Sequence, residues 1–335
     1  MQDNNSFDIS NRRYIGSKTK LVKWIFENLN LENIESICDI FAGSGVIASN
    51  FTKKPQIKNI ILNDLLYSNE LIYSAFFLGH NINFKPLLEL TNLFNNNLDL
   101  KPNYFSDNFS DKFFSYNDCL KIGSIREYIA FLQIDDISKN ILLASLIYSM
   151  DKIANTVGHY EAYRKSHIPQ DKFVFRLIKP IKHSKTIQIY RQNANILAKE
   201  IKADLVFIDP PYNSRQYSRF YHIYENLVEW KKPKLSGIAL KPIADNMSEY
   251  CRSNADKELE NLIANLKCKQ IALTYNNTYN SKSKSSQNKI SFSEIENILK
   301  QKGKVTIKEK KHNYFNTGKT KFNEHKEYLF IVEVK

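Results

Sequence analysis

The residues with the clearest chemical potential are Asp209, Pro210, Pro211 and Tyr212, which directly follow the apolar run 205–208. An apolar strand that ends this way places a carboxylate, a backbone carbonyl and an aromatic ring at the carboxyl edge of a sheet, where open α/β folds bind ligands. The carboxylate and carbonyl can accept hydrogen bonds from an amino group, and the tyrosine ring can stack on a flat base. The same residues also suit an ordinary turn, because proline ends strands. Alone, the tetrapeptide does not decide between a site and a turn.

A second candidate site is the segment 39–45, Asp-Ile-Phe-Ala-Gly-Ser-Gly, between a predicted strand over residues 34–41 and a helix-like stretch from Val46. Glycines at such a turn let a ligand approach the backbone closely. The segment is not the G-x-G-x-x-G of dinucleotide sites, and Asp64 follows a second predicted strand, over residues 59–62, where a ribose diol is usually held. The pattern favours a nucleoside ligand such as S-adenosylmethionine. The alternative is a βαβ unit with a coincidental acid.

A basic turn, residues 12–18 with the sequence Arg-Arg-Tyr-Ile-Gly-Ser-Lys, precedes an amphipathic helix with apolar residues between positions 21 and 29. In one interpretation Ser17 caps that helix and Lys18 is a solvated charge. In the other, the turn holds the carboxylate end of the same nucleoside ligand, because it directly precedes the glycine-loop strand.

Composition limits the class of protein. The 335 residues suffice for one large α/β domain with an inserted module. Lys and Arg exceed Asp and Glu by 48 to 35, a net charge of +13 that favours a polyanionic partner. The four cysteines show no metal-ligand spacing, so we expect buried thiols and no metal site. Without a signal-like amino terminus or a long apolar run, we expect a soluble, cytoplasmic protein and no membrane partner.

Taken in chain order, four segments resemble the motifs of the Dam-like, alpha-group DNA adenine-N6 methyltransferases: residues 14–18, residues 39–45, Asp64, and residues 209–212. Residues 213–217 and 221–226 resemble the subgroup found in restriction-modification systems. Residues 270–275 and 327–334 resemble the late strands of the family, so the resemblance extends over nearly the whole chain. It implies an α/β fold, a Rossmann-like class I methyltransferase sheet with an inserted, mostly helical target-recognition domain.

The resemblance also implies an activity and a domain plan. The catalytic domain would comprise residues 1–65 and 186–335, and the inserted DNA-binding domain residues 66–185. The enzyme would transfer a methyl group from S-adenosyl-L-methionine to N6 of a flipped adenine in double-stranded DNA, with a cognate restriction endonuclease as a candidate partner. The catalytic residues would be Asp209, Pro210, Pro211 and Tyr212. The cofactor-binding residues would be Tyr14, Gly16, Lys18, Asp39, Phe41, Ala42, Gly43, Ser44, Gly45, Asp64, Asn193 and Asp209.

One position departs from the family pattern. Where many members have an acid near the cofactor's adenine, this chain has Asn193, or alternatively Asn195. An amide oxygen can still accept a hydrogen bond from the adenine amino group, but the bond is no longer assisted by charge.

The insertion contains a predicted buried helix over residues 136–153, followed by a polar segment over residues 151–160. This segment suits contacts to base edges and phosphates, and equally a helix end capped by Gly158. Further on, residues 276–289 predict a loop, which with Lys308, Lys310, Lys311, Lys319 and Lys321 forms a basic edge suited to phosphates. The predicted DNA-binding residues are Asn155, His159, Tyr160, Arg164, Lys165, Arg215, Tyr217 and Tyr221.

Other functions remain open at this point. The tetrapeptide chemistry does not itself select adenine, so methylation of cytosine N4 or of adenine in RNA is an alternative. A DNA-binding relative without catalysis is another, although the intact tetrapeptide and glycine loop argue against it.

Overall fold

The computed structural model describes residues 6–278, 286–311 and 325–335. The chain divides into two compact units. We call residues 18–65, 184–217 and 246–335 the sheet unit, and residues 1–17, 66–183 and 218–245 the helical unit. The breaks after residues 65 and 183 lie at or near the expected ends of the insertion. Residues 6–17 and 218–245, which we expected in the catalytic domain, pack within the helical unit.

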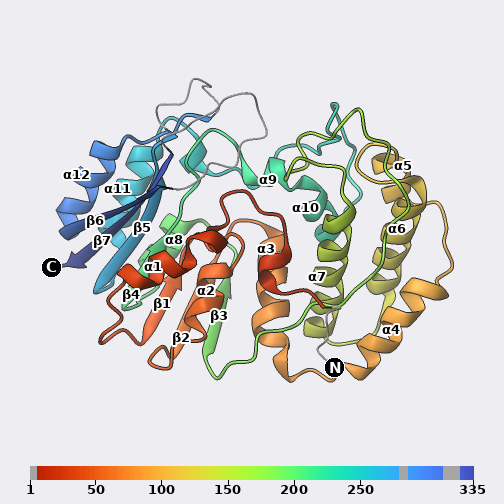
Figure 1. The fold of residues 1–335 in the computed structure, drawn as a ribbon, viewed down its shortest axis with the longest axis horizontal. Coiled ribbons are helices and arrows are strands. Elements are labelled where there is room, and N and C mark those ends of the chain that lie inside the picture. The colour runs from red at the N-terminus through yellow and green to blue at the C-terminus, as the bar shows by residue number, and fades with distance from the viewer. Residues whose placement is uncertain (1–5, 279–285, 312–324) are drawn as a thin grey trace. The chain divides into compact units, whose positions relative to one another are not determined.

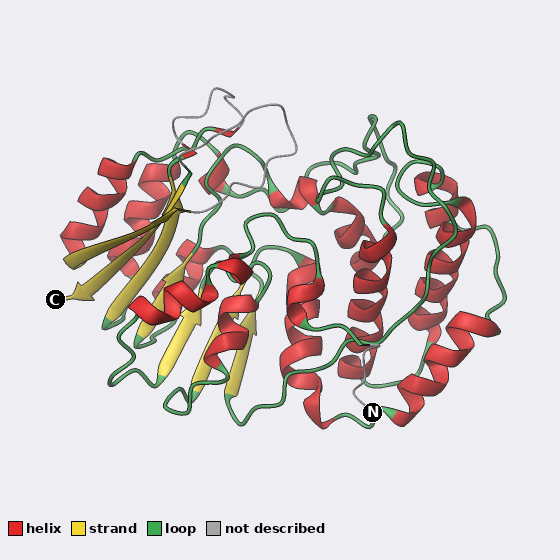
Figure 2. Ribbon diagram, viewed as in Figure 1, coloured by secondary structure: helices red, strands yellow, loops and turns green. Residues whose placement is uncertain are grey.

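The sheet unit contains one seven-stranded sheet in the order β3-β2-β1-β4-β5-β7-β6 (Figure 2). The pairs from β3 through β5 are parallel, and β7 is antiparallel to both of its neighbours. The strands are β1 (Ser36–Asp39), β2 (Asn59–Asn63), β3 (Thr186–Tyr190), β4 (Leu205–Ile208), β5 (Gln270–Asn276), β6 (Gly303–Lys311) and β7 (Lys326–Val334). The strand order reverses between β1 and β4, so the expected Rossmann-like doubly wound sheet is confirmed.

The strands form where apolar runs were found in the sequence. Every residue of β4 is buried, as expected for a central parallel strand covered on both faces. The predicted strands over residues 59–62, 270–275 and 327–334 are each one residue longer in the structure. The strand predicted over residues 34–41 covers only Ser36–Asp39.

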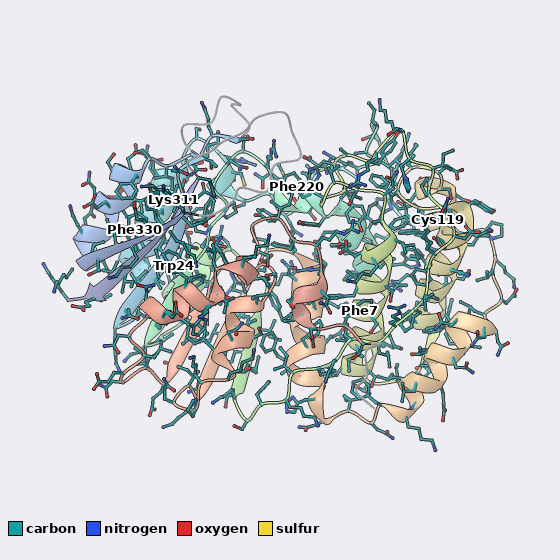
Figure 3. All side chains as sticks on the ribbon, viewed as in Figure 1. Phe7, Trp24, Cys119, Phe220, Lys311 and Phe330 are labelled. Carbon is teal, nitrogen blue, oxygen red and sulfur yellow. The ribbon has the colours of Figure 1, made fainter. Side chains whose placement is uncertain are left out.

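Helices cover both faces of this sheet. One face packs on α8 (Ala194–Glu200), α11 (Ala255–Asn265) and α12 (Phe292–Lys302), which share a buried apolar core with β1, β4, β5 and β7. Figure 1 shows α1 (Val22–Asn28) and α2 (Val46–Phe51) on the opposite face. Trp24 of α1 and Phe330 of β7 are labelled in Figure 3. The 3-10 helices η2 (Lys18–Lys20) and η5 (Glu249–Cys251) complete the unit.

The helical unit has no named strand within its described residues. It consists of η1 (Ile9–Asn11), α3 (Tyr67–Tyr73), the π-helix η3 (Ser74–Leu78), η4 (Gly79–Asn81), α4 (Lys85–Asn96), α5 (Tyr104–Phe109), α6 (Tyr116–Phe131), α7 (Asp136–Ile153) and α10 (His222–Glu229). A short helix, α9 (Tyr217–Phe220), contains the boundary between the units. Helix α7 is buried along most of its length and has the predicted bounds.

Two capping interpretations are wrong. Ser17 does not cap α1, because η2 intervenes and the residue before α1 is Leu21, whose side chain makes no capping bond. Gly158 does not cap α7, which ends at Ile153 and is followed by Ala154 with a non-helical ψ of 127°. Gly158 does have a positive φ of 106°, so its role is in the loop that follows. Among the residues that the structure describes, no helix is long and apolar enough to cross a bilayer.

Candidate active site

The sheet topology brings the two motif acids to one edge. Asp39 is the last residue of β1, and Asp209 directly follows β4. These strands are parallel neighbours with Asp39 opposite Phe207, so both acids lie at the carboxyl ends of adjacent strands. The strand order reverses between these two strands, which is where doubly wound folds bind their ligands.

The carboxylate of Asp209 is held by three side chains. Lys18 Nζ lies 2.8 Å from Oδ2, and the Thr274 hydroxyl donates to Oδ1 at 2.8 Å. The Tyr212 hydroxyl also donates to Oδ1. The Lys18 ammonium and the Asp209 side chain are only 6% and 19% exposed, so solvent screens this ion pair weakly. Asp209 and Tyr212 are close in sequence, whereas Lys18 and Thr274 reach the Asp209 carboxylate only because of the fold.

The carboxylates near Lys18 and Tyr212 raise the pKa of both residues. Burial disfavours the ammonium of Lys18, but the carboxylates of Asp209 and Glu327 outweigh burial and raise the pKa of Lys18 above its ordinary value. Burial, with the same two carboxylates, raises the pKa of the Tyr212 phenol well above its ordinary value. Lys18 is therefore a cation and Tyr212 a neutral hydroxyl at neutral pH. The ammonium also lies 5.1 Å from the centre of the Tyr212 ring.

Asp39 is in an unusual environment for a carboxyl group. Asp39 is 1% exposed, and neither of its side-chain oxygens has a hydrogen-bond partner of ordinary geometry in the described part of the chain. Burial, together with the carboxylates of Asp209 and Asp64, raises its pKa well above the usual range, although the Ala48 backbone still favours the charged form. A buried carboxyl with unused acceptors suits a cationic or multiply donating ligand group.

The glycine loop has the backbone that its sequence predicts. Gly43 and Gly45 have positive φ values of 51° and 75°, which residues with a Cβ adopt only with strain. The N–H of Gly43 donates to the Asp64 carboxylate at 3.0 Å, which fixes the acid that follows β2 beside the loop. Phe41 packs edge-on against Tyr250, with ring centres 5.0 Å apart. Ala42 and Ser44 are both buried.

The side-chain amide of Asn193, at the start of α8, uses its oxygen to cap its own helix. The side-chain oxygen of Asn193 accepts from the backbone N–H of Asn195 at 2.8 Å, as an N-cap. The amide of Asn195 bonds at both ends, donating to the Glu258 carbonyl and accepting from the Tyr250 hydroxyl. Both ends of the Asn195 amide are thus used within the fold, so Asn193 stays our prediction for this contact.

A family model described as "D12 class N6 adenine-specific DNA methyltransferase" matches residues 14–290, which include the basic turn, the glycine loop, Asp64 and the tetrapeptide. The chain belongs to this family. It is an adenine-specific DNA methyltransferase.

Curated relatives resemble the methyltransferase along almost all of its length. The type II methyltransferase M.NlaIII of Neisseria lactamica is 28% identical over 352 residues, covering 96% of this chain and 98% of the relative. The modification methylase StsI of Streptococcus sanguinis is 30% identical over 360 residues, covering 96% of this chain and 52% of the relative. The type II methyltransferase M.FokI of Planomicrobium okeanokoites is 27% identical over 351 residues, with the same two coverages. The methyltransferase thus spans almost the whole of one relative and about half of the other two.

The two remaining cofactor predictions, Tyr14 and Gly16, lie in the helical unit of the methyltransferase. The ring of Tyr14 stacks on Tyr221 at 4.9 Å, and the Tyr221 hydroxyl accepts the N–H of Ile15 at 2.7 Å. Gly16 has a positive φ of 80°, so the turn that leads to Lys18 requires glycine here. Tyr221 therefore fixes the basic turn that carries these residues.

The predicted DNA-binding residues divide by exposure. Tyr160 and Tyr221 are fully buried, and the amide of Asn155 is buried and donates to the backbone carbonyls of Lys112 and Arg164. In this structure those three residues support the fold. Arg164 and Lys165 are exposed.

The remaining DNA-binding predictions are half-buried. The ring of His159 stacks on Phe220, labelled in Figure 3, at 4.5 Å. Arg215 donates to the Ser286 hydroxyl at 3.2 Å, and Tyr217 is also half-buried. Of the predicted basic edge, Lys308, Lys310 and Lys311 lie on β6, whereas residues 279–285, Lys319 and Lys321 lie outside the described residues.

Sequence reasoning missed Thr274 and a buried network in the helical unit. In that network Asp151 accepts from the Tyr224 hydroxyl at 2.6 Å and from the backbone N–H of Arg13 at 2.7 Å. The Arg12 guanidinium donates to Asn69 at 2.8 Å. Pairing β5 beside β4 would have found Thr274, but no local pattern joins residues 12–13 to residue 151. Among described residues, no group of three or more His, Cys, Asp or Glu is arranged to hold a metal ion.

Proposed function

We propose that the methyl donor is S-adenosyl-L-methionine and that Asp209 and its neighbours receive an adenine flipped out of duplex DNA. The observation that carries the proposal is the pair of acids at the switch point, Asp209 with its fixed carboxylate and Asp39 with buried, unused acceptors. Asp39, the glycine-loop backbone and Asp64 fit a nucleoside bearing a cationic amino group. When bound, this donor supplies an electrophilic methyl group on a sulfonium.

Residues of the protein activate the adenine amino group for methyl transfer. The adenine amino group is a weak nucleophile because its lone pair is delocalised into the ring. The Asp209 carboxylate and the Pro210 carbonyl would each accept one of its N–H bonds, which favours tetrahedral nitrogen and stabilises the positive charge that develops there. Lys18 and Thr274 hold the carboxylate in place for this contact.

Tyr212 has two possible partners in this scheme. Its hydroxyl donates to Asp209 Oδ1, the atom that we assign to the adenine amino group. We infer that the incoming base replaces this hydroxyl bond and that the ring then stacks on the base. Stacking offsets part of the few kcal/mol that flipping costs.

The exposed Arg164 and Lys165, with His159 and Arg215, are our candidates for DNA contact, because cations and polar rings suit phosphates and base edges. M.NlaIII and its fellow relatives are named as type II methyltransferases or modification methylases. We infer that this enzyme likewise modifies the recognition site of a restriction-modification system and has a cognate endonuclease. In a cell without a nucleus, this substrate would place it in the cytoplasm.

The direct test replaces Asp209. Asp209→Ala should remove methyl transfer to DNA while leaving S-adenosylmethionine binding measurable by calorimetry, because the cofactor's main contacts are assigned to other residues. The matched control is Asp107→Ala, which removes an exposed carboxylate from α5. Turnover of Asp209→Ala within about tenfold of the parent, roughly 1.4 kcal/mol, would contradict the assignment.

A further inference from the structure

Thr274 has no place in the tetrapeptide, the glycine loop or the basic turn, yet its hydroxyl contacts the central acid. It is 1% exposed, and its hydroxyl donates to Asp209 Oδ1 at 2.8 Å. The Thr274 hydroxyl oxygen in turn accepts from the Tyr212 hydroxyl at 3.4 Å. We propose that Thr274 is a positioning residue for methyl transfer, which fixes the Asp209 carboxylate in the orientation that the target amino group needs. The proposal rests on the function assigned to Asp209 above.

The sheet explains why Thr274 reaches this acid. The parallel register of β4 and β5 ends at Ile208 opposite Leu273, so the next residue of β5 comes beside the residue that follows β4. Strand β5 continues past the end of β4 because β7 pairs with it as far as Asn276 opposite Glu327. The backbone of Thr274 is therefore held by β7, opposite Leu329.

The hydrogen bonds of Asp209 show what this hydroxyl does. A carboxylate offers about four acceptor positions, of which Lys18 takes one on Oδ2 and the two hydroxyls take two on Oδ1. If the target amino group replaces Tyr212, Thr274 remains the only donor that the described structure gives Oδ1. Without it, Asp209 is held at Oδ2 alone and can rotate about its terminal bond. Small losses of alignment reduce rates strongly when catalysis depends on orientation.

Two substitutions separate positioning from packing. Thr274→Val keeps the branched shape and removes the hydroxyl, whereas Thr274→Ser keeps the hydroxyl and removes a methyl group. We expect Thr274→Val to slow single-turnover methyl transfer by about tenfold to a hundredfold, corresponding to the loss of one hydrogen bond to a charged group. Thr274→Ser should stay within about threefold of the parent, a small fraction of that loss. The dissociation constant for S-adenosylmethionine and the KM for duplex DNA should not change in either variant.

The matched control is Thr52→Val, which removes another buried threonine hydroxyl, one that donates to the Ser49 carbonyl in α2. A double-mutant cycle with Tyr212→Phe sharpens the test, because the incoming base displaces the Tyr212 hydroxyl and leaves Thr274 as the hydroxyl on Oδ1 in either background. Thr274→Val should then cost about the same factor as in the parent.

Three results would overturn the inference. The first is parental transfer rates in Thr274→Val. The second is the loss of that factor in the Tyr212→Phe background, which would show that Thr274 acts through its contact with the Tyr212 hydroxyl and not on Asp209. The third is a combined loss of rate, cofactor affinity and melting temperature that serine does not restore, which would show a packing role. If the parent enzyme itself methylates no DNA adenine, the proposed function fails and this inference fails with it. Failure of the inference alone would leave parental methylation intact.

Discussion

At the scale of single residues, the Asp209 carboxylate is held by donors from distant parts of the chain. Lys18 comes from the turn before α1, Tyr212 from the loop after β4, and Thr274 from β5. The sequence predicted the identity of the acid and of the aromatic ring because they are adjacent in one motif. It predicted Lys18 as a cofactor contact, and the structure adds that the Lys18 ammonium pairs with Asp209. Local spacing could not show this ion pair, because it joins two separate motifs.

The two parts of Tyr212 make separable contributions. Tyr212→Phe retains the ring and should keep kcat/KM for duplex DNA within about tenfold of the parent, because Thr274 and Lys18 still hold Asp209. Tyr212→Ala also loses base stacking, about 1–3 kcal/mol, and should reduce kcat/KM by a further tenfold to a hundredfold. Steady-state kinetics on one duplex substrate measures both. Equal impairment of the two variants would show that the hydroxyl, rather than the ring, is the important part.

At the scale of elements, the sheet was predictable because its strands are short apolar runs followed by polar motif residues. Helix α7 was predictable for the same reason, as a long apolar segment with a polar boundary. The assignment of residues 1–17 and 218–245 to the helical unit was not, because it depends on contacts such as Ile15 N–H to the Tyr221 hydroxyl. Such contacts join positions more than 200 residues apart and leave no periodic signal in the sequence.

Asp204 links the strands at their amino ends, which lie at the opposite end of the sheet from the site. Its Oδ2 accepts from the backbone N–H groups of Glu35 and Ser36, each at 2.9 Å, and its Oδ1 lies 2.8 Å from Lys269 Nζ. Burial opposes the charge, but Lys269 and these N–H groups outweigh it and lower the pKa of Asp204 to about 2. One side chain thus joins the amino ends of β1, β4 and β5.

A carboxyl group whose pKa is lower in the folded than in the unfolded protein stabilises the fold at pH values above its unfolded pKa. This stabilisation is lost as the pH falls through the folded-state pKa. Asp204→Asn should therefore lower the free energy of unfolding at pH 7 by about 2 kcal/mol. The difference from the parent should shrink as the pH falls from about 4 to about 2, and urea unfolding at several pH values measures it. A difference that stays constant over that range would mean that the charge of Asp204 contributes little.

At the scale of the whole molecule, the net charge of +13 is the feature that the sequence showed most directly. It indicates a polyanionic partner but does not locate the contact surface. The structure reduces the number of candidate DNA-binding residues, because Arg164 and Lys165 are exposed whereas Tyr160 and Tyr221 are buried. Which bases the enzyme reads depends on a surface whose shape the sequence motifs do not encode.

Salt dependence tests these contacts. Arg164→Ala and Lys165→Ala should each weaken DNA binding and reduce the slope of log affinity against log salt by about one, because each removes one phosphate contact. Lys199→Ala, an exposed lysine at the end of α8, is the control and should leave the slope unchanged. Fluorescence anisotropy with a labelled duplex over a salt series measures the slopes. Parental slopes in both variants would exclude this segment from the DNA interface.

We propose that the Asp209 carboxylate, beside β4, directs a methyl group to N6 of adenine in duplex DNA. The most direct test incubates the purified enzyme and its Asp209→Ala variant with methyl-labelled S-adenosylmethionine and, separately, duplex DNA, single-stranded DNA or RNA, followed by digestion to nucleosides and chromatography. We expect label in N6-methyladenine from duplex DNA with the parent enzyme, and none with the variant. Label in N4-methylcytosine, label only in RNA, or undiminished label with Asp209→Ala would contradict it.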